Sequence, residues 1–270
     1  MLEVMDIYKS YHKGGLFFLK DRQKVLQGIS FSVKQGECVG LIGESGSGKS
    51  TLSRLVLGLE KPDKGEVKVE GDNILTWRKK NLGQMSVVFQ DYNTATNPRF
   101  TIQEIIAEPL FTLPQKKGIT TLVLELLDKV GLSAKLLARY PHELSGGQLQ
   151  RVCLARAIST QPRLMVLDEA LSSLDVSIQV QILELLRNLK KDLNLTYLFI
   201  AHDIQTITYL CDQVLFLYQG KILEQLPSCE LSTAKNDYAK RLLASVITFD
   251  DYDYDENLPV VHDEPQYNRR

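Results

Sequence analysis

A glycine-rich segment at residues 43–51 (GESGSGKST) constrains this chain most. It fits the pattern G-x-x-x-x-G-K-[ST] without a gap. The apolar run 38–42 before it predicts a buried strand, and residues 51–59 after it predict a helix with apolar positions at 52, 55, 56 and 59. A glycine turn between a strand and a helix directs backbone N–H groups, and the positive end of the helix dipole, toward phosphate oxygens.

The side chains at the end of this segment favour a nucleotide as the ligand. Lys49 can reach β- and γ-phosphates, and the hydroxyl of Ser50 can bind Mg²⁺. A glycine-rich turn that binds nothing is the alternative, and the flanking strand and helix argue against it. The other members of the segment are assigned to the same site, namely Gly43, Glu44, Ser45, Gly46, Ser47, Gly48 and Thr51.

The overall composition limits the possible partners and compartments. The chain has 270 residues, of which 44% are hydrophobic and 24% charged, and its net charge of −1 gives no basic field for nucleic acid or anionic membranes. Its four cysteines lack C-x-x-C spacing, which predicts structural thiols in a reducing compartment. No signal peptide is visible, and no apolar run reaches the roughly 20 residues that span a bilayer. We therefore expect a cytoplasmic chain whose membrane association comes through partner subunits.

Strand and helix patterns alternate along the chain, which predicts a largely parallel sheet covered by helices. Residues 91–159 break this alternation with a helical insertion, and residues 246–270 form an acidic, mobile tail after a domain at 1–245. The expected strands are 3–8, 28–36, 66–71 (short and exposed), 85–90, 164–169, 195–201 and a closing hairpin at 212–220 and 221–225, and the expected helices are 103–108, 121–131 and 179–193, with a surface helix or loop at 72–84.

Two carboxylates end the apolar run 164–167. An aspartate at this place, Asp168, can hold Mg²⁺ beside Ser50. Side chains alternate along a strand, so Glu169 is expected to point elsewhere, where it can polarise an attacking water as general base. A pair of acids capping a surface strand is the alternative, and the glycine-rich loop of the same chain argues against it.

Three further polar or aromatic residues are candidates for the site. Gln90 and His202 each follow a strand, and strand ends of a parallel sheet converge on a ligand crevice, where these side chains can orient water and the γ-phosphate. Tyr11 lies between the first strand and a turn, where an exposed aromatic ring can stack on adenine. Taken alone, a surface tyrosine without function is the alternative.

A second helix start resembles an anion site. In the segment 144–151 (LSGGQLQR), Ser145 is well placed as the N-cap, and Gly146 and Gly147 leave the first backbone N–H groups bare. One mononucleotide does not need both helix starts. The second start can serve a nucleotide that another subunit holds.

The order of these segments resembles the nucleotide-binding subunits of ABC transporters over nearly all of residues 1–245. LSGGQ together with a glycine-rich phosphate loop is highly specific for that family. The resemblance implies a P-loop NTPase fold with a mostly parallel core sheet, an antiparallel β subdomain and an inserted helical subdomain. It also implies the following roles: Walker A at 43–51, Q-loop and magnesium ligand at Gln90, signature at 144–148 with Gln148 included, Walker B at Asp168, catalytic glutamate at Glu169, D-loop at 172–175 ending on Asp175, switch histidine at His202 and adenine-stacking ring at Tyr11.

A narrower resemblance concerns the uptake branch for dipeptides, oligopeptides and nickel. Residues 89–91 (FQD), 97–101 (NPRFT) and 105–110 (IIAEPL) are similar to that branch. Residues 236–243 (NDYAKRLL) are similar to its HPYT-x-x-LL segment, with Asn-Asp and Ala at changed positions. Residues 148–157 (QLQRVCLARA) look most like nickel-import ATPases.

The resemblance implies an ATP-hydrolysing subunit, with ATP and Mg²⁺, of an importer for nickel, a related metal chelate or short peptides. Its expected partners are a second, identical or related ABC ATPase subunit in a head-to-tail dimer, two integral membrane permease subunits, and an extracellular or periplasmic solute-binding protein. It would act at the cytoplasmic face of the membrane as a peripheral subunit, without nucleic acid and without binding nickel itself. The alternative is a soluble ABC ATPase of DNA repair or translation, but such chains usually carry a coiled-coil insertion or two cassettes.

Overall fold

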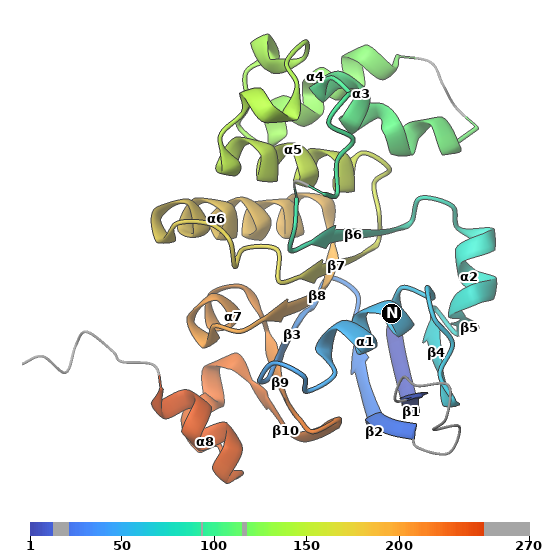
Figure 1. Ribbon diagram of the computed structural model, residues 1–270, viewed down its shortest axis with the longest axis vertical. Helices are drawn as coiled ribbons and strands as arrows, with labels where there is room; N and C mark the ends of the chain where they lie inside the picture. Colours follow the sequence, from blue (N-terminus) through green and yellow to red (C-terminus); the bar gives the residue numbers. More distant parts are fainter. Residues whose placement is uncertain (13–21, 93, 115–117, 246–270) are drawn as a thin grey trace, which may run out of the picture.

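Two β-sheets form the framework of the protein (Figure 1), as described by a computed structural model for residues 1–12, 22–92, 94–114 and 118–245. The larger sheet has six strands in the order β10-β9-β3-β8-β7-β6. All its neighbouring pairs are parallel except β9 with β10, which form the predicted closing hairpin. These strands are β3 (Cys38–Ile42), β6 (Met85–Phe89), β7 (Leu164–Asp168), β8 (Thr196–Ala201), β9 (Gln213–Tyr218) and β10 (Lys221–Pro227).

The central strands are apolar on both faces because the sheet separates two hydrophobic cores. In β3, Cys38 and Ile42 face the core that contains the helical insertion, whereas Val39 and Leu41 face the core of the smaller sheet. Strand β8 alternates in the same way, and all of its residues are buried. The continuous apolar runs of the sequence therefore arise from burial on two faces.

The smaller sheet has four antiparallel strands in the order β2-β1-β4-β5. They are β1 (Leu2–His12), β2 (Arg22–Val33), β4 (Lys64–Val69) and β5 (Asp72–Asn73). The expectation that residues 66–71 form an exposed strand was wrong on burial, because β4 lies between two strands and buries Val67 and Val69 in the core. The turn expected after Tyr11 and the tail expected at 246–270 lie outside the described residues.

The helix after the glycine-rich loop, α1 (Lys49–Val56), begins and ends earlier than the predicted 51–59. Gly58 has a φ of +63°, and this left-handed residue ends the helix as glycine commonly does. Leu59 therefore does not belong to the apolar face of the helix, and 55% of its surface is exposed.

Helices α1 and α2 lie beside the smaller sheet, and α3, α4 and α5 form the upper part of the molecule in Figure 1. No helix within the described residues is both long and apolar enough to cross a membrane. The helices are α2 (Ile74–Lys80), α3 (Ile102–Ala107), α4 (Ile119–Lys129), α5 (Gly146–Ile158), α6 (Val176–Leu193), α7 (Ile204–Leu210) and α8 (Asp237–Ala244), with 3-10 turns at Glu108–Thr112, Ala134–Leu136, Pro141–Glu143 and Ser228–Thr233. All four cysteines are free, and three are buried.

Candidate functional site

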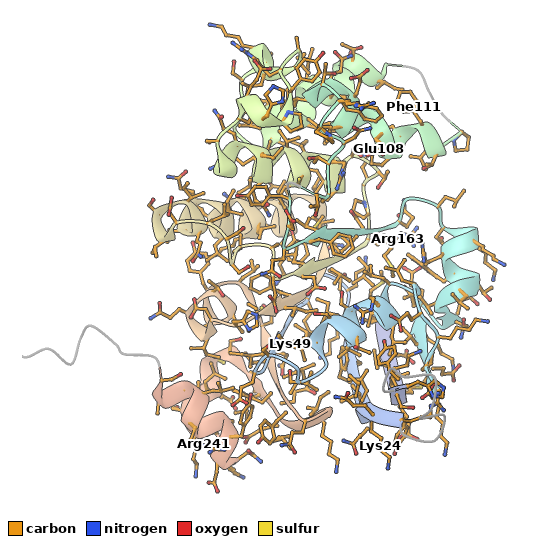
Figure 2. All side chains as sticks on the ribbon, viewed as in Figure 1. Lys24, Lys49, Glu108, Phe111, Arg163 and Arg241 are labelled. Atoms are coloured by element: carbon orange, nitrogen blue, oxygen red, sulfur yellow. The ribbon has the colours of Figure 1, made fainter. Side chains whose placement is uncertain are left out.

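A cleft of about 490 Å³ lies at the start of α1, next to Lys49 (labelled in Figure 2). Its size is typical of small-ligand sites. It brings together five predicted parts of the site, namely Tyr11, the glycine-rich loop, Gln90, Glu169 and His202, and two residues of β2 that were not predicted, Gln23 and Val25. The lining residues are Tyr11, Gln23, Val25, Ser45, Gly46, Gly48, Lys49, Ser50, Thr51, Gln90, Glu169 and His202.

The glycines of the loop allow close backbone contacts. Gly48 has a φ of +112°, and a Cβ there would lie 2.7 Å from Cδ2 of Leu26. A Cβ at Gly43 would lie 2.2 Å from the carbonyl oxygen of Leu217. Gly48 is also the N-cap of α1 and caps it with no side chain, so the first backbone N–H groups of α1 face the cleft for an anion.

Lys49 is the buried cation of the cleft, with 4% of its surface exposed. Its ammonium donates to the carbonyl oxygens of Gly43 at 2.7 Å and Glu44 at 3.1 Å, and lies 3.8 Å from Oε1 of Glu169. Burial lowers the pKa of Lys49, while the carboxylates of Glu169 and Asp168 act in the opposite direction. A desolvated ammonium beside free helix N–H groups is suited to a phosphate group.

Glu169 leaves strand β7 rather than alternating within it. Its φ is +51°, and its backbone N–H donates to the carbonyl oxygen of Ile200 at 2.9 Å. Strand alternation was therefore the wrong basis for placing Glu169, because β7 ends at Asp168 and Glu169 has a left-handed backbone. The left-handed backbone turns the side chain into the cleft, where Lys49 and His202 contact it.

His202 connects Glu169 to Lys49. Its Nε2 lies 2.6 Å from Oε1 of Glu169, and its Nδ1 lies 3.5 Å from the ammonium of Lys49. An ammonium can only donate, so this arrangement suits a ring that accepts at Nδ1 and donates from Nε2. The next residue, Asp203, caps α7 by accepting from the N–H groups of Gln205 and Thr206, which fixes the backbone beside His202.

Asp168 is the last residue of β7, and it lies close enough to Lys49 for its charge to act to raise the pKa of the ammonium. Burial raises the pKa of the Asp168 carboxyl, and the neighbouring Glu169 carboxylate acts in the same direction. The hydroxyl of Ser50, the amide oxygen of Gln90 and this carboxylate are hard oxygen donors of the kind that Mg²⁺ prefers. In chemistry the three side chains therefore fit a magnesium site.

The raised pKa of Asp168 predicts a pH-dependent stability difference. In the metal-free protein the ionised carboxylate destabilises the folded state, so Asp168→Asn is expected to unfold at a higher denaturant concentration at pH 8 than the wild type. The advantage should shrink as the pH falls through the pKa of the folded state, because the wild-type carboxyl then becomes neutral. Urea unfolding of both proteins over a series of pH values from 8 downward measures this. A difference that grows in acid would contradict the raised pKa.

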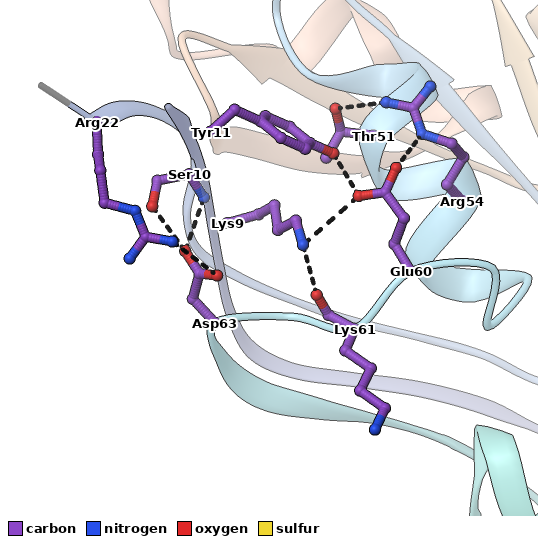
Figure 3. Close-up of polar contacts among 9 residues, drawn as sticks. All are labelled: Lys9, Ser10, Tyr11, Arg22, Thr51, Arg54, Glu60, Lys61 and Asp63. Atoms are coloured by element: carbon purple, nitrogen blue, oxygen red, sulfur yellow. Dashed lines mark hydrogen bonds and ion pairs between the residues drawn. The ribbon is translucent and has the colours of Figure 1, made fainter. Parts of the chain in front are cut away.

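Tyr11 lies within β1, paired with Gln23 of β2, rather than between a strand and a turn. The ring, which was expected to be exposed, is half-buried. Its hydroxyl donates to Oε2 of Glu60 at 2.5 Å (Figure 3). No local signal predicts this contact, because the two residues are 49 positions apart.

The second helix start has the predicted cap. Ser145 accepts from the N–H of Gln148 at 3.3 Å, and the Gln148 side chain accepts from the N–H of Ser145 at 3.0 Å. The described residues that line the cleft include none from segment 144–148, and β6 and β7 separate α5 from α1 in Figure 1. Asp175 is the exposed residue before α6 and also lies outside the cleft lining.

A comparison with family models decides the family. The model described as ABC transporter matches residues 26–172, more than half of the chain. The chain belongs to the ABC transporter family. It has that family's ATP-binding cassette, and the fold predicted from the resemblance is confirmed.

Curated relatives of this ATPase cover nearly its full length. The metal-staphylopine import system ATP-binding protein CntF of Staphylococcus aureus (strain NCTC 8325 / PS 47) is 43% identical over 92% of this chain and 100% of its own. The oligopeptide transport ATP-binding protein AppF of Bacillus subtilis is 40% identical over 91% of this chain and 78% of its own. The nickel import ATP-binding protein NikE of Escherichia coli O157:H7 is 40% identical over 92% of this chain and 94% of its own.

A solved cassette has the same architecture. It is the dimeric, post-hydrolysis state of the ATP-binding cassette MJ0796 bound to ADP and Pi. The TM-score is 0.75 at 26% identity, over 84% of this chain and 99% of the other. The ATP-binding and ATPase assignments are thereby confirmed.

Among the described residues, no group of three or more His, Cys, Asp or Glu side chains is placed to hold a metal ion.

Proposed function

We propose that this ATPase drives an importer for nickel, another metal chelate or short peptides. The names of CntF and NikE state import and that of AppF states oligopeptide transport, which favours an importer over an ATPase of DNA repair or translation. The observation that carries the proposal is the presence of two helix starts suited to phosphate, α1 and α5, of which only α1 borders the cleft. A head-to-tail pair of cassettes gives each start a role, because ATP on one subunit then meets α5 of the other.

Within the cleft, each polar side chain has a proposed task in hydrolysis. Lys49 and the N–H groups at the start of α1 bind the phosphates, and the Glu169 carboxylate accepts a proton from the attacking water. His202 donates from Nε2 to Glu169 and so orients the base, and Gln90 orients the water. Ser50, Gln90 and Asp168 would hold Mg²⁺, which when bound neutralises charge on the phosphates. The Tyr11 ring stacks on adenine.

On the partner side, Ser145, Gly146, Gly147 and Gln148 are proposed to bind the γ-phosphate of the nucleotide held by the other subunit. Asp175 would face the same interface from the start of α6. The partner is a second cassette subunit, identical or related. The remaining partners are two membrane permease subunits and an extracellular or periplasmic binding protein, which places the chain at the cytoplasmic face of the membrane.

The contact with the permease subunits is proposed for the segment after Gln90 and the helical insertion. Arg156 of α5 donates to the carbonyl oxygen of Ala95 at 2.6 Å and lies 3.6 Å from a carboxylate oxygen of Glu108. These bonds join the segment after Gln90 to the helix that carries the signature. Figure 2 shows Glu108 and Phe111 together on the insertion, and 56% of the Phe111 surface is exposed. Motion at the cleft can therefore reach an exposed apolar side chain.

An uptake experiment tests the function and identifies the cargo. A strain that lacks this gene is expected to lose uptake of either radioactive nickel or labelled di- and oligopeptides, and the wild-type gene should restore it. Glu169→Gln should not restore it, although the variant should be made in equal amount. Co-purification with integral membrane subunits is expected in the same strain. Normal uptake of all these cargoes in the deletion strain, together with co-purification with nucleic acid or ribosomes, would refute the importer proposal.

A further inference from the structure

The end of β1 is joined to the loop that follows α1 by two carboxylates, Glu60 and Asp63 (Figure 3). Lys9 and Tyr11 both contact Oε2 of Glu60: the ammonium of Lys9 lies 3.5 Å from it, and the hydroxyl of Tyr11 donates to it at 2.5 Å. Ser10, between them, donates to Asp63 from its backbone N–H at 2.9 Å and from its hydroxyl at 2.7 Å. The two carboxylates therefore bind alternate residues of the strand.

Glu60 also binds the helix that begins at the phosphate loop. Its Oε1 accepts from Nε of Arg54 at 2.6 Å, while its Oε2 accepts from Tyr11. Arg54 in turn lies within 3.4 Å of the hydroxyl of Thr51, which lines the cleft. A continuous set of contacts thus runs from the phosphate end of the cleft, through Arg54 and Glu60, to the aromatic ring at its edge.

The charges and burial at Glu60 favour a fixed geometry. Its carboxylate faces Arg54 and Lys9, and about a quarter of its side chain is exposed. Partial burial acts to raise the pKa of Glu60, but the hydrogen bonds from Tyr11 and Arg54 outweigh it and lower the pKa. The carboxylate therefore stays ionised, and a charged acceptor gives the hydroxyl of Tyr11 a stronger bond than a neutral one.

We propose that Glu60 and Arg54 are positioning residues that hold the ring of Tyr11 over the cleft and so set its affinity for a nucleobase. The inference rests on the proposed function in one respect, the stacking of Tyr11 on adenine. A tyrosine ring that is fixed before binding loses less freedom when the base stacks on it, so the ligand keeps more of the interaction as affinity. The same contacts fix the distance between the base platform and the phosphate loop.

The test compares a ligand that has a base with one that lacks it. For Glu60→Gln, we expect the Kd of Mg-ATP to rise about fivefold to tenfold, which corresponds to one ordinary hydrogen bond, while the Kd of Mg-tripolyphosphate stays unchanged. Tyr11→Phe keeps the ring and removes its hydroxyl, so it should show the same pattern. In the Tyr11→Phe background, Glu60→Gln should have no further effect. Calorimetric titration of the purified full chain with each of the two ligands measures these Kd values for the wild type, the two single variants and the double variant.

Asp63→Asn is the matched control, because this carboxylate binds the same strand without contacting Tyr11. Its Kd for ATP should stay within twofold of wild type. An equal loss in Asp63→Asn, or a loss of tripolyphosphate binding in Glu60→Gln, would overturn the inference in favour of general loosening. Tyr11→Ala separates the stacking of the ring on adenine from the positioning of the ring by Glu60 and Arg54. An unchanged ATP affinity in this variant would refute the stacking role itself. A loss in Tyr11→Ala without one in Glu60→Gln and Tyr11→Phe refutes only the positioning.

Discussion

Replacing Glu169 by glutamine is expected to lower the rate of ATP hydrolysis by roughly 10²- to 10⁴-fold, the usual contribution of a general base. The amide has the size of the carboxylate and keeps an oxygen for Nε2 of His202, which lies 2.6 Å from it in the wild type. It cannot take a proton from water. ATP binding should be kept, because removing a negative charge 3.8 Å from the Lys49 ammonium leaves that cation free for phosphate.

Single-turnover hydrolysis and equilibrium ATP binding, measured on the same preparation, separate the two effects. Glu184→Gln is the matched control, since this carboxylate lies on an exposed position of α6 outside the cleft lining. It should hydrolyse ATP at the wild-type rate. Hydrolysis at that rate by Glu169→Gln would instead remove Glu169 from the role of base.

The ends of the core strands could be predicted from the sequence because each is a local pattern. An apolar run stops where a polar residue begins, and this placed Gln90, Asp168 and His202 at the carboxyl ends of strands in a parallel sheet. The cap at Ser145 is equally local, since its hydrogen-bond partner is three residues away. The glycine-rich loop is recognised together with its own strand and helix, so this part of the cleft could be predicted from local patterns.

The remaining details depend on contacts between distant segments. The left-handed backbone at Glu169 is supported by a hydrogen bond to Ile200, 31 residues later, and strand alternation gave no sign of it. Tyr11 is held by Glu60 across 49 residues, and a tyrosine beside a predicted turn carried no hint of that partner. Gln23 lines the cleft because it pairs with Tyr11 across two antiparallel strands. Its place could not be predicted from the sequence, because the predicted strand began at residue 28 and the pairing register of β1 with β2 was not known.

The second large effect is expected at Ser145, which tests whether two chains complete one site. Ser145→Asp should lower ATP hydrolysis by roughly 10²- to 10³-fold, the loss seen when one preorganised donor to a transition state is removed. Aspartate is a good N-cap, so α5 should keep its start. Its charge, however, would face the γ-phosphate brought by the partner subunit. The ATP affinity of a single chain should not change, because Ser145 does not line its own cleft.

Ser145→Asn is the matched control, because asparagine has nearly the same shape, caps a helix equally well and carries no charge. It should retain much more activity than Ser145→Asp. In the Glu169→Gln background, where ATP stays bound, the aspartate variant should also abolish the ATP-dependent association of cassettes seen by size-exclusion chromatography, with a second copy or with the related partner subunit. If Ser145→Asp hydrolysed ATP like the wild type, the start of α5 would not lie at the nucleotide. The cleft around Lys49 would then have to be complete within one chain.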